Sequence, residues 1–529
     1  MTSKRIIFTG QSGIKIDGIL KDFINKHSSF VRGRQKPLIL KIEGEMKNIY
    51  LKEHNDAADS ATLWMRNILM LPAPTLYNLW EKAFESVLKT IENGENKNKD
   101  IFINLHACFY HHTTVEYLSP AKIELLKKFN PDLFITLIDD IYDIHNRLRY
   151  PNQIFCGLYG GASDPVGAIF ELMRILDWRA KEIMMTKYFA HELGVPNYVF
   201  AVKHSYDTLY KLIFEDKHTF YISHPISEVR RLQKIGENEK ANQMIEEIRM
   251  LGVKFSSEFV SFLPTTIDEL RIQHRNNKKK ERIPKLMPRW DSEKYLNPTD
   301  LLFTPPRKRN EFDPIWEEEH KNSKELCLLL EELYKLIEVQ VSSRDHKLVE
   351  QSRFLFVYRP CFNGNISGGV WKEIQYFRML TNSEIDKKCF IYMPTEDQNK
   401  LKIRQFEKIL ESEIRNGTIT CKDEKLITLD PEEENKLIAA DNNINILTDV
   451  FKEIMDNKSI RCSGIERRGL EEDSSQKAIS FIENITEQYV AIFNQYINQY
   501  KQDKTVLWEE NNQSPGTLVD KIIKYLKNK

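Results

Sequence analysis

The residues best suited to chemistry follow one another in the second half of the chain. A helical stretch carries Asp345, an apolar strand follows at 354–358, and a glycine turn at 367–369 opens a second helix with Glu373 in its first turn. Ligands of α/β sheets bind at the carboxyl ends of strands, where this turn lies. Its backbone N–H groups would form a cradle for an anion, and the positive end of the helix dipole favours an ionised Glu373.

This arrangement is suited to breaking a bond at the C1 atom of a sugar. A positioned, ionised carboxylate can attack C1 or stabilise the oxocarbenium character that develops there, while a second acid serves the leaving group. In a simpler interpretation, Glu373 only stabilises its helix and Asp345 is a charge on an exposed helix face.

The segment resembles the nucleoside 2'-deoxyribosyltransferase superfamily. It is closest in pattern to the 2'-deoxynucleoside 5'-monophosphate N-glycosidases, whose core reads Arg-Asp, an apolar strand, then Ser-x-Gly-Val-x-x-Glu. The matching residues here are Arg344-Asp345, the strand at 354–358, and the run from Ser367 to Glu373. With the tyrosine-containing strand at 220–223 and the strand ending at Pro264, the resemblance covers about 218–270 and 323–394.

The resemblance implies cleavage or transfer of a base from a ribosyl or deoxyribosyl group. By position, Glu373 matches the nucleophilic carboxylate of the family. Asp345 matches the acid that assists at sugar and base, and Tyr221 matches the tyrosine that orients the nucleophile.

The same resemblance implies where the substrate is held. Ser367, Gly368 and Gly369 match the loop that binds a 5'-phosphate. His224, in the turn after Tyr221, is a further substrate-binding candidate, although the family usually has small residues there. A related branch, the TIR-like NAD hydrolases, has a glutamate in a comparable pocket, so the expected substrate is either a deoxynucleotide or NAD.

A glycine turn near the N-terminus has the context of a phosphate-binding loop but lacks its key residues. It follows an apolar strand and opens a helix, and it resembles the loop of P-loop nucleotide kinases of the adenylate kinase kind over residues 1–205. That pattern places glycine, lysine and serine or threonine at positions 15, 16 and 17, where this chain has Lys15, Ile16 and Asp17. The candidate nucleotide-binding residues of this turn are Gly10, Ser12, Gly13 and Lys15.

Phosphoryl transfer is disfavoured by these replacements, because the displaced lysine and the lost hydroxyl are the groups that contact phosphate and Mg²⁺. We expect a regulatory domain that binds a nucleotide or a protein partner, or else a scaffold that binds neither. Arg147, Arg149 and Arg179 would either contact phosphate or lie on the surface as ordinary arginines.

The elements around these residues predict an α/β protein with two parallel-sheet domains, because buried strands alternate with helices through most of the chain. We expect a P-loop-kinase-like domain at 1–205 and a Rossmann-like N-glycosidase domain at 218–394, interrupted by an insertion at 271–322. Residues 395–529 are predicted to form a helical C-terminal region.

Composition excludes several classes of function. The 77 basic and 77 acidic residues cancel, so bulk attraction to nucleic acid or to an anionic membrane is not expected. No apolar run reaches the roughly 18 residues of a membrane span, and seven scattered cysteines without CxxC indicate reduced thiols in a cytoplasmic protein. No cofactor or metal is predicted, since no second ligand pair accompanies His106, Cys108, His111 and His112.

The sequence therefore predicts a nucleotide N-glycosidase-like effector under the control of a degenerate nucleotide-binding domain. Sensing domains joined to nucleotide-destroying domains resemble bacterial antiviral effectors, which implies homo-oligomers and a triggering nucleotide or protein partner. A nucleotide-binding sensor without turnover and a nucleotide kinase remain as alternatives.

Overall fold

The computed structural model describes residues 3–527 with internal gaps. The longer gaps are 28–34, 55–67, 150–164, 287–323, 421–427 and 463–470, and the others span five residues or fewer. The chain divides into two compact units, Met1–Thr219 with Arg249–Ser352, and Phe220–Ile248 with Arg353–Lys529. The helix that carries Asp345 falls in the first of these units.

The first unit contains a parallel sheet in the order β2-β3-β1-β6-β7. Its central strands are buried on both faces, which is why they are continuous apolar runs in the sequence. Since β1 lies between β3 and β6, the segments that follow these three strands emerge at one edge of the sheet. The strands are β1 (Arg5–Thr9), β2 (Leu38–Lys41), β3 (Ile101–Asn104), β6 (Leu133–Ile138) and β7 (Asn197–Ala201).

Amphipathic helices surround this sheet and bury their apolar faces. In α4, for example, Leu76, Trp80, Phe84 and Val87 recur at helical spacing and are buried. The helices of the first unit are α1 (Ile16–His27), α2 (Ile42–His54), α4 (Ala73–Glu92), α5 (Ile123–Phe129), α6 (Ile141–Arg149), α7 (Pro165–Leu193), α8 (Tyr206–Phe214) and α11 (Lys324–Glu350). Short strands complete it: β4 (Phe109–His111) with β5 (Glu116–Leu118), β9 (Val260–Phe262), and β10 (Ile272–Asn276) with β11 (Arg282–Leu286).

The second unit has a parallel arrangement of its own, with strands in the order β16-β13-β12-β8. Rings from adjacent strands, Phe220, Phe354 and Phe390, pack together in its core. The strands are β8 (Thr219–Ser223), β12 (Phe354–Tyr358), β13 (Lys388–Tyr392) and β16 (Thr505–Trp508). Its helices are α9 (Ile226–Ile235), α12 (Gly368–Thr381) and α17 (Pro515–Lys527), and α10 (Asn238–Glu258) begins in this unit.

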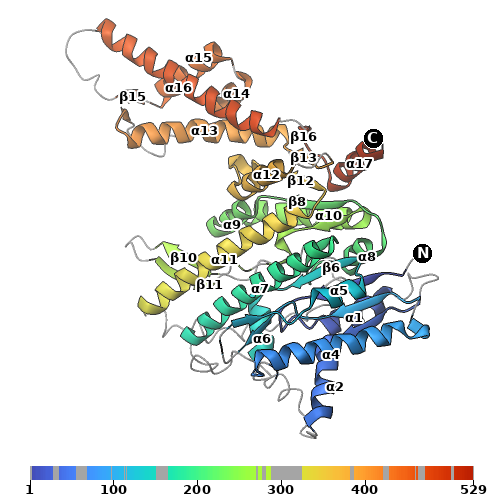
Figure 1. Cartoon of the computed structure of the whole chain (residues 1–529). Helices are drawn as coiled ribbons and strands as arrows, with labels where there is room; N and C mark the ends of the chain where they lie inside the picture. The colour runs from blue at the N-terminus through green and yellow to red at the C-terminus, as the bar shows by residue number, and fades with distance from the viewer. Residues whose placement is uncertain are drawn as a thin grey trace. The chain divides into compact units, whose positions relative to one another are not determined.

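A helical bundle follows β13 (Figure 1). It has an apolar core of its own. Phe406, Phe451 and Tyr489 meet at its centre. A capping box between Asp430 and Glu433 fixes the start of one of its helices. The bundle consists of α13 (Thr395–Arg415), α14 (Pro431–Ala439), α15 (Ile444–Asn457) and α16 (Glu471–Tyr500).

The predicted α/β class with parallel sheets is confirmed, but three elements differ from expectation. β2 was not predicted, because its short sequence differs little in apolar character from the segments on either side. The C-terminal region is not wholly helical, since β16 pairs with β13. α10 continues to Glu258, so the strand expected to end at Pro264 is reduced to β9, which ends at Phe262. Within the described part of the chain, no helix has the length and apolar character needed to cross a membrane.

Candidate active site and the Gly10 loop

In the second unit, Glu373 lies buried against two hydroxyl groups of β8. The Tyr221 hydroxyl donates to Oε1 of Glu373 at 2.7 Å, and the Ser223 hydroxyl donates to Oε2. Tyr221 and Ser223 are two residues apart on one strand, so their side chains share a face of the sheet. Each carboxylate oxygen therefore has its own donor, and the orientation of the carboxylate is fixed.

Strand pairing brings these three residues together. β12 lies beside β8 with Leu355 opposite Tyr221, and α12 follows β12 after a short connection. Glu373 is the sixth residue of α12, so it lies in the second turn and not in the first turn as predicted. The helix dipole acts mainly within the first turn, and the hydroxyl donors are thus the principal partners of this carboxylate.

The glycine turn before Glu373 is open. Ser367 donates its N–H to the Pro360 carbonyl at 3.0 Å, which anchors the turn. Gly368 and Gly369 are exposed, and a Cβ atom added to either would meet nothing within 4 Å. As the first residues of α12, their N–H groups have no intrahelical acceptor. This is the position and the kind of donor that a phosphate cradle requires.

His224 is buried beside this site. Its Nδ1 atom lies 3.3 Å from the Ile222 carbonyl oxygen. Burial lowers the pKa of His224 to about 4. The ring is therefore neutral at pH 7, and any contact with a phosphate would be a neutral hydrogen bond and not an ion pair.

Two carboxylates, Asp397 and Glu228, hold the connection between β12 and α12. Neither contact was predicted from the sequence. Arg359, directly after β12, forms a two-point ion pair with Asp397 at 2.7 and 2.8 Å. The buried carboxylate of Glu228 accepts from the side-chain amides of Asn363 and Asn365 at 3.3 and 3.2 Å. Arg359 stands immediately after a predicted strand, and this position was the feature of the sequence that could have indicated the first contact. These contacts fix the connection that leads to the open turn.

Asp345 belongs to the first unit, where it is buried next to Arg344. The Arg344 guanidinium pairs with Asp345 at 2.9 Å and also donates to the carbonyl oxygens of Pro264 and Ile267, each at 3.1 Å. Burial raises the pKa of the Asp345 carboxyl, although the Arg344 charge works in the opposite direction. Asp345 is therefore not a charge on an exposed helix face.

The Gly10 loop of the first unit is closely packed. Gly10 donates its N–H to the Glu182 carboxylate at 3.0 Å, and the Gly13 carbonyl accepts from Arg147 at 2.7 Å. Ser12 is buried, whereas Lys15 is exposed and has a φ of 60°. The structure thus places Gly10 and Ser12 in the interior, leaves Gly13 half-buried and leaves Lys15 outside.

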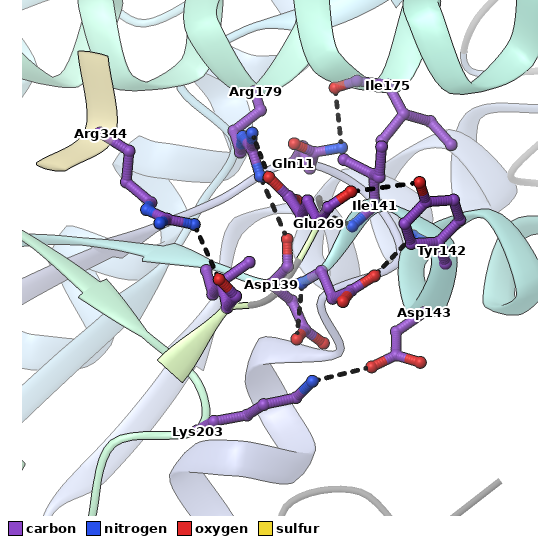
Figure 2. Close-up of polar contacts among 12 residues, drawn as sticks. Gln11, Asp139, Ile141, Tyr142, Asp143, Ile175, Arg179, Lys203, Glu269 and Arg344 are labelled. Atoms are coloured by element: carbon purple, nitrogen blue, oxygen red, sulfur yellow. Dashed lines mark hydrogen bonds and ion pairs between the residues drawn. The ribbon is translucent and has the colours of Figure 1, made fainter. Parts of the chain in front are cut away.

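Buried ion pairs lie beside this loop, after β6 and along α7 (Figure 2). Arg179 pairs with Glu269 at 2.5 and 3.0 Å, and Arg147 pairs with Asp139. Both arginines are buried, so the expectation of surface arginines is wrong for these two. Their guanidinium groups already have carboxylate partners and are not presented to a phosphate. Arg149 lies in α6, but its side chain is outside the described residues.

The histidines near β4 make ordinary contacts. His106 pairs with Glu43 at 2.6 Å, and His111 lies 2.8 Å from the Leu71 carbonyl oxygen. His112 is outside the described residues. Among the residues that the structure describes, no group of three or more His, Cys, Asp or Glu side chains is arranged to hold a metal ion.

The Glu373 site combines an oriented carboxylate with free backbone donors at an open turn. These are the parts needed to stabilise positive charge at a sugar C1 atom and to hold an anionic group of the same molecule. No protein-family model and no curated protein matches the chain. The proposed function therefore depends on the geometry of the site and on the motif that carries the resemblance.

Proposed function

We propose that the second unit cleaves the bond between base and sugar in a nucleotide, either a deoxynucleotide or NAD. The observation that carries this proposal is the buried Glu373 carboxylate, oriented by Tyr221 and Ser223 beside the open turn at Gly368 and Gly369. Donors are required by any buried carboxylate, so the support for the proposal lies in the combination of this oriented carboxylate with an open glycine turn.

In the proposed reaction, the C1–N bond breaks and its electron pair leaves with the base. Glu373 attacks C1 or stabilises its positive charge. Water then supplies the hydroxyl that replaces the base, breaking the bond between C1 and Glu373 where one has formed, and the proton released by this water ends on the base. Gly368 and Gly369 donate N–H groups to a phosphate of the substrate. The resemblance assigns to Asp345 the assistance of the leaving base and the sugar, but Asp345 belongs to the first unit and is given no step in the reaction proposed for the second. The two hydroxyl groups act as positioning groups for the Glu373 carboxylate.

Control by the first unit, self-association and a role in antiviral defence extend this proposal by domain-level analogy. They concern when the site is active and not what it does. A stimulated reaction that requires high protein concentration would support self-association.

The test is chromatography of reactions with deoxynucleotides, ribonucleotides and NAD over a range of protein concentrations, comparing the wild type with Glu373→Gln. Free base from the wild type alone would establish the activity and the substrate class. Glu433→Gln is a matched control, because Glu433 is also a buried glutamate of this unit but caps a bundle helix. Saturable binding without base release would indicate a binding module, and phosphoryl transfer from ATP would indicate a kinase.

A further inference from the structure

Three backbone N–H groups of the first unit converge on one buried carboxylate. Gly10 and Ala107 donate to Oε1 of Glu182 at 3.0 and 2.7 Å, and Cys108 donates its N–H to Oε2 at 2.9 Å. The Cys108 thiol is a further donor to Oε2, at 3.3 Å. Four donors on two oxygens is the pattern of an ionised carboxylate, held where water is excluded, since Glu182 is only 1% exposed.

These donors lie where an α/β sheet binds its ligands. Gly10 directly follows β1, and Ala107 and Cys108 come soon after β3, the neighbouring strand. The carboxyl ends of adjacent parallel strands form the usual ligand crevice, and clustered N–H groups there are a recurrent anion-binding device. Glu182 reaches them from α7, so the anion in this structure comes from the chain itself.

A protonated histidine completes the anion site. His106 donates through Nδ1 to the Gly10 carbonyl and pairs through Nε2 with Glu43. Burial disfavours its charged form, but the Glu43 and Glu182 carboxylates outweigh this and raise the pKa of His106 to about 9. Burial raises the pKa of Glu182, while His106 and the N–H donors act in the opposite direction. The backbone groups therefore donate to Glu182 directly, and the charge of His106 acts on it only electrostatically.

The loop is closely packed on the side where side chains would lie at Gly10 and Gly13. A Cβ atom added to Gly10 would lie 2.9 Å from the Leu137 carbonyl oxygen. At Gly13, where φ is +90°, an added Cβ would lie 3.1 Å from Leu148. The lysine of the loop, Lys15, is exposed.

We infer that Glu182 is a built-in anion that takes the place of a ligand phosphate at the Gly10 loop. The first unit then does not bind a nucleotide through this loop, and a trigger that acts on this unit binds elsewhere. Removal of the Glu182 side chain leaves an oxyanion site for a small carboxylate. This inference does not depend on the proposed glycosidase activity.

The test uses the full chain and formate as the probe. In Glu182→Ala, we expect the thermal unfolding midpoint of the first unit to fall by several degrees and to recover with formate in a saturable way. Chloride at the same ionic strength should not restore it. Glu171→Ala is the matched control, because Glu171 is a buried glutamate of the same helix that pairs with a side chain, His145, at 2.5 Å. Its midpoint should fall without specific recovery in formate.

Nucleotide titrations complete the test. The wild type should show no binding of ATP that depends on the loop. ATP binding that weakens at least tenfold in Lys15→Ala would overturn the inference, and so would an equal response of wild type and Glu182→Ala to formate. If Glu182→Ala does not fold, Glu182→Gln replaces it. That variant keeps one acceptor oxygen, so its midpoint should fall less and it should bind ATP no better than the wild type.

Discussion

Glu182 and Glu373 are both buried glutamates near the carboxyl edge of a parallel sheet, but their donors differ. Backbone N–H groups hold Glu182, whereas side-chain hydroxyl groups hold Glu373. A backbone donor is fixed by the fold, while a hydroxyl can rotate toward a substrate. The type of donor, more than the burial of the carboxylate, thus separates a structural glutamate from one suited to reaction.

The glycines beside the two carboxylates also differ, because one turn is closely packed and the other is open. Gly10 is packed against Leu137, while Gly368 and Gly369 face open space. In the first loop, glycine is required because the chain passes close to other backbone atoms. In the second, the absence of a side chain leaves N–H groups accessible at a helix N-terminus. One turn is closed by its own protein and the other is available to a ligand.

The comparison is tested most strongly by Glu373→Gln. We expect base release to fall on the order of 10³-fold or more, because the neutral amide cannot attack C1 or stabilise its charge. The measurement is single-turnover base release with matched circular dichroism. A variant that retains more than a tenth of wild-type activity would remove Glu373 from the chemistry.

Gly10→Ala and Gly368→Ala compare the closed turn with the open one. Gly10→Ala should lower the free energy of unfolding of the first unit by about 1–3 kcal/mol, since its Cβ would press on the Leu137 carbonyl. Gly368→Ala should change that of the second unit by less than about 0.5 kcal/mol. Denaturant titration followed separately for each unit provides both values, and equal losses would contradict the distinction.

Tyr221→Phe and Ser223→Ala sharpen the assignment of the hydroxyl groups. Each variant removes one donor to the Glu373 carboxylate, so kcat should fall about tenfold to a hundredfold with little change in KM. Steady-state kinetics measures the two constants. A rise in KM at constant kcat would instead place the hydroxyl groups in substrate binding.

The pH dependence of stability should differ between the two units. The pKa of His106 is raised to about 9, so its contribution is complete below pH 6.5 and is lost as the pH rises through 9. The pKa of His224 is lowered to about 4, so the second unit loses stability as the pH falls from 6.5 to 4. Each pKa unit corresponds to about 1.4 kcal/mol.

Two variants show which histidine causes each loss of stability. His106→Gln should flatten the alkaline limb of the unfolding free energy of the first unit, and His224→Gln should flatten the acid limb of the second. Thermal unfolding between pH 4 and pH 9.5 measures both. Burial lowers the pKa of His204 to about 3. His204 therefore adds a loss of stability at acid pH to the first unit, and neither variant removes it.

Much of the fold could be predicted from sequence. Strands β8 and β12 were expected at 220–223 and 354–358, and the structure places each within a residue of that range. β16 could not be recognised, because this short apolar run between helices forms a strand only by pairing with β13. The order of strands in each sheet depends on long-range pairing, which local patterns do not encode.

At the candidate sites, the sequence by itself determined which residues can do chemistry, namely the Glu373 carboxylate, the Tyr221 hydroxyl and the two glycine turns. Only the tertiary structure decided their partners. Ser223 shares the Glu373 carboxylate because β8 pairs with β12, and Glu182 fills the Gly10 loop from a helix far along the chain. Residue types follow from the sequence, whereas the donors that a carboxylate meets depend on chain segments separated by about 75 to 170 residues, which only the packed fold brings together.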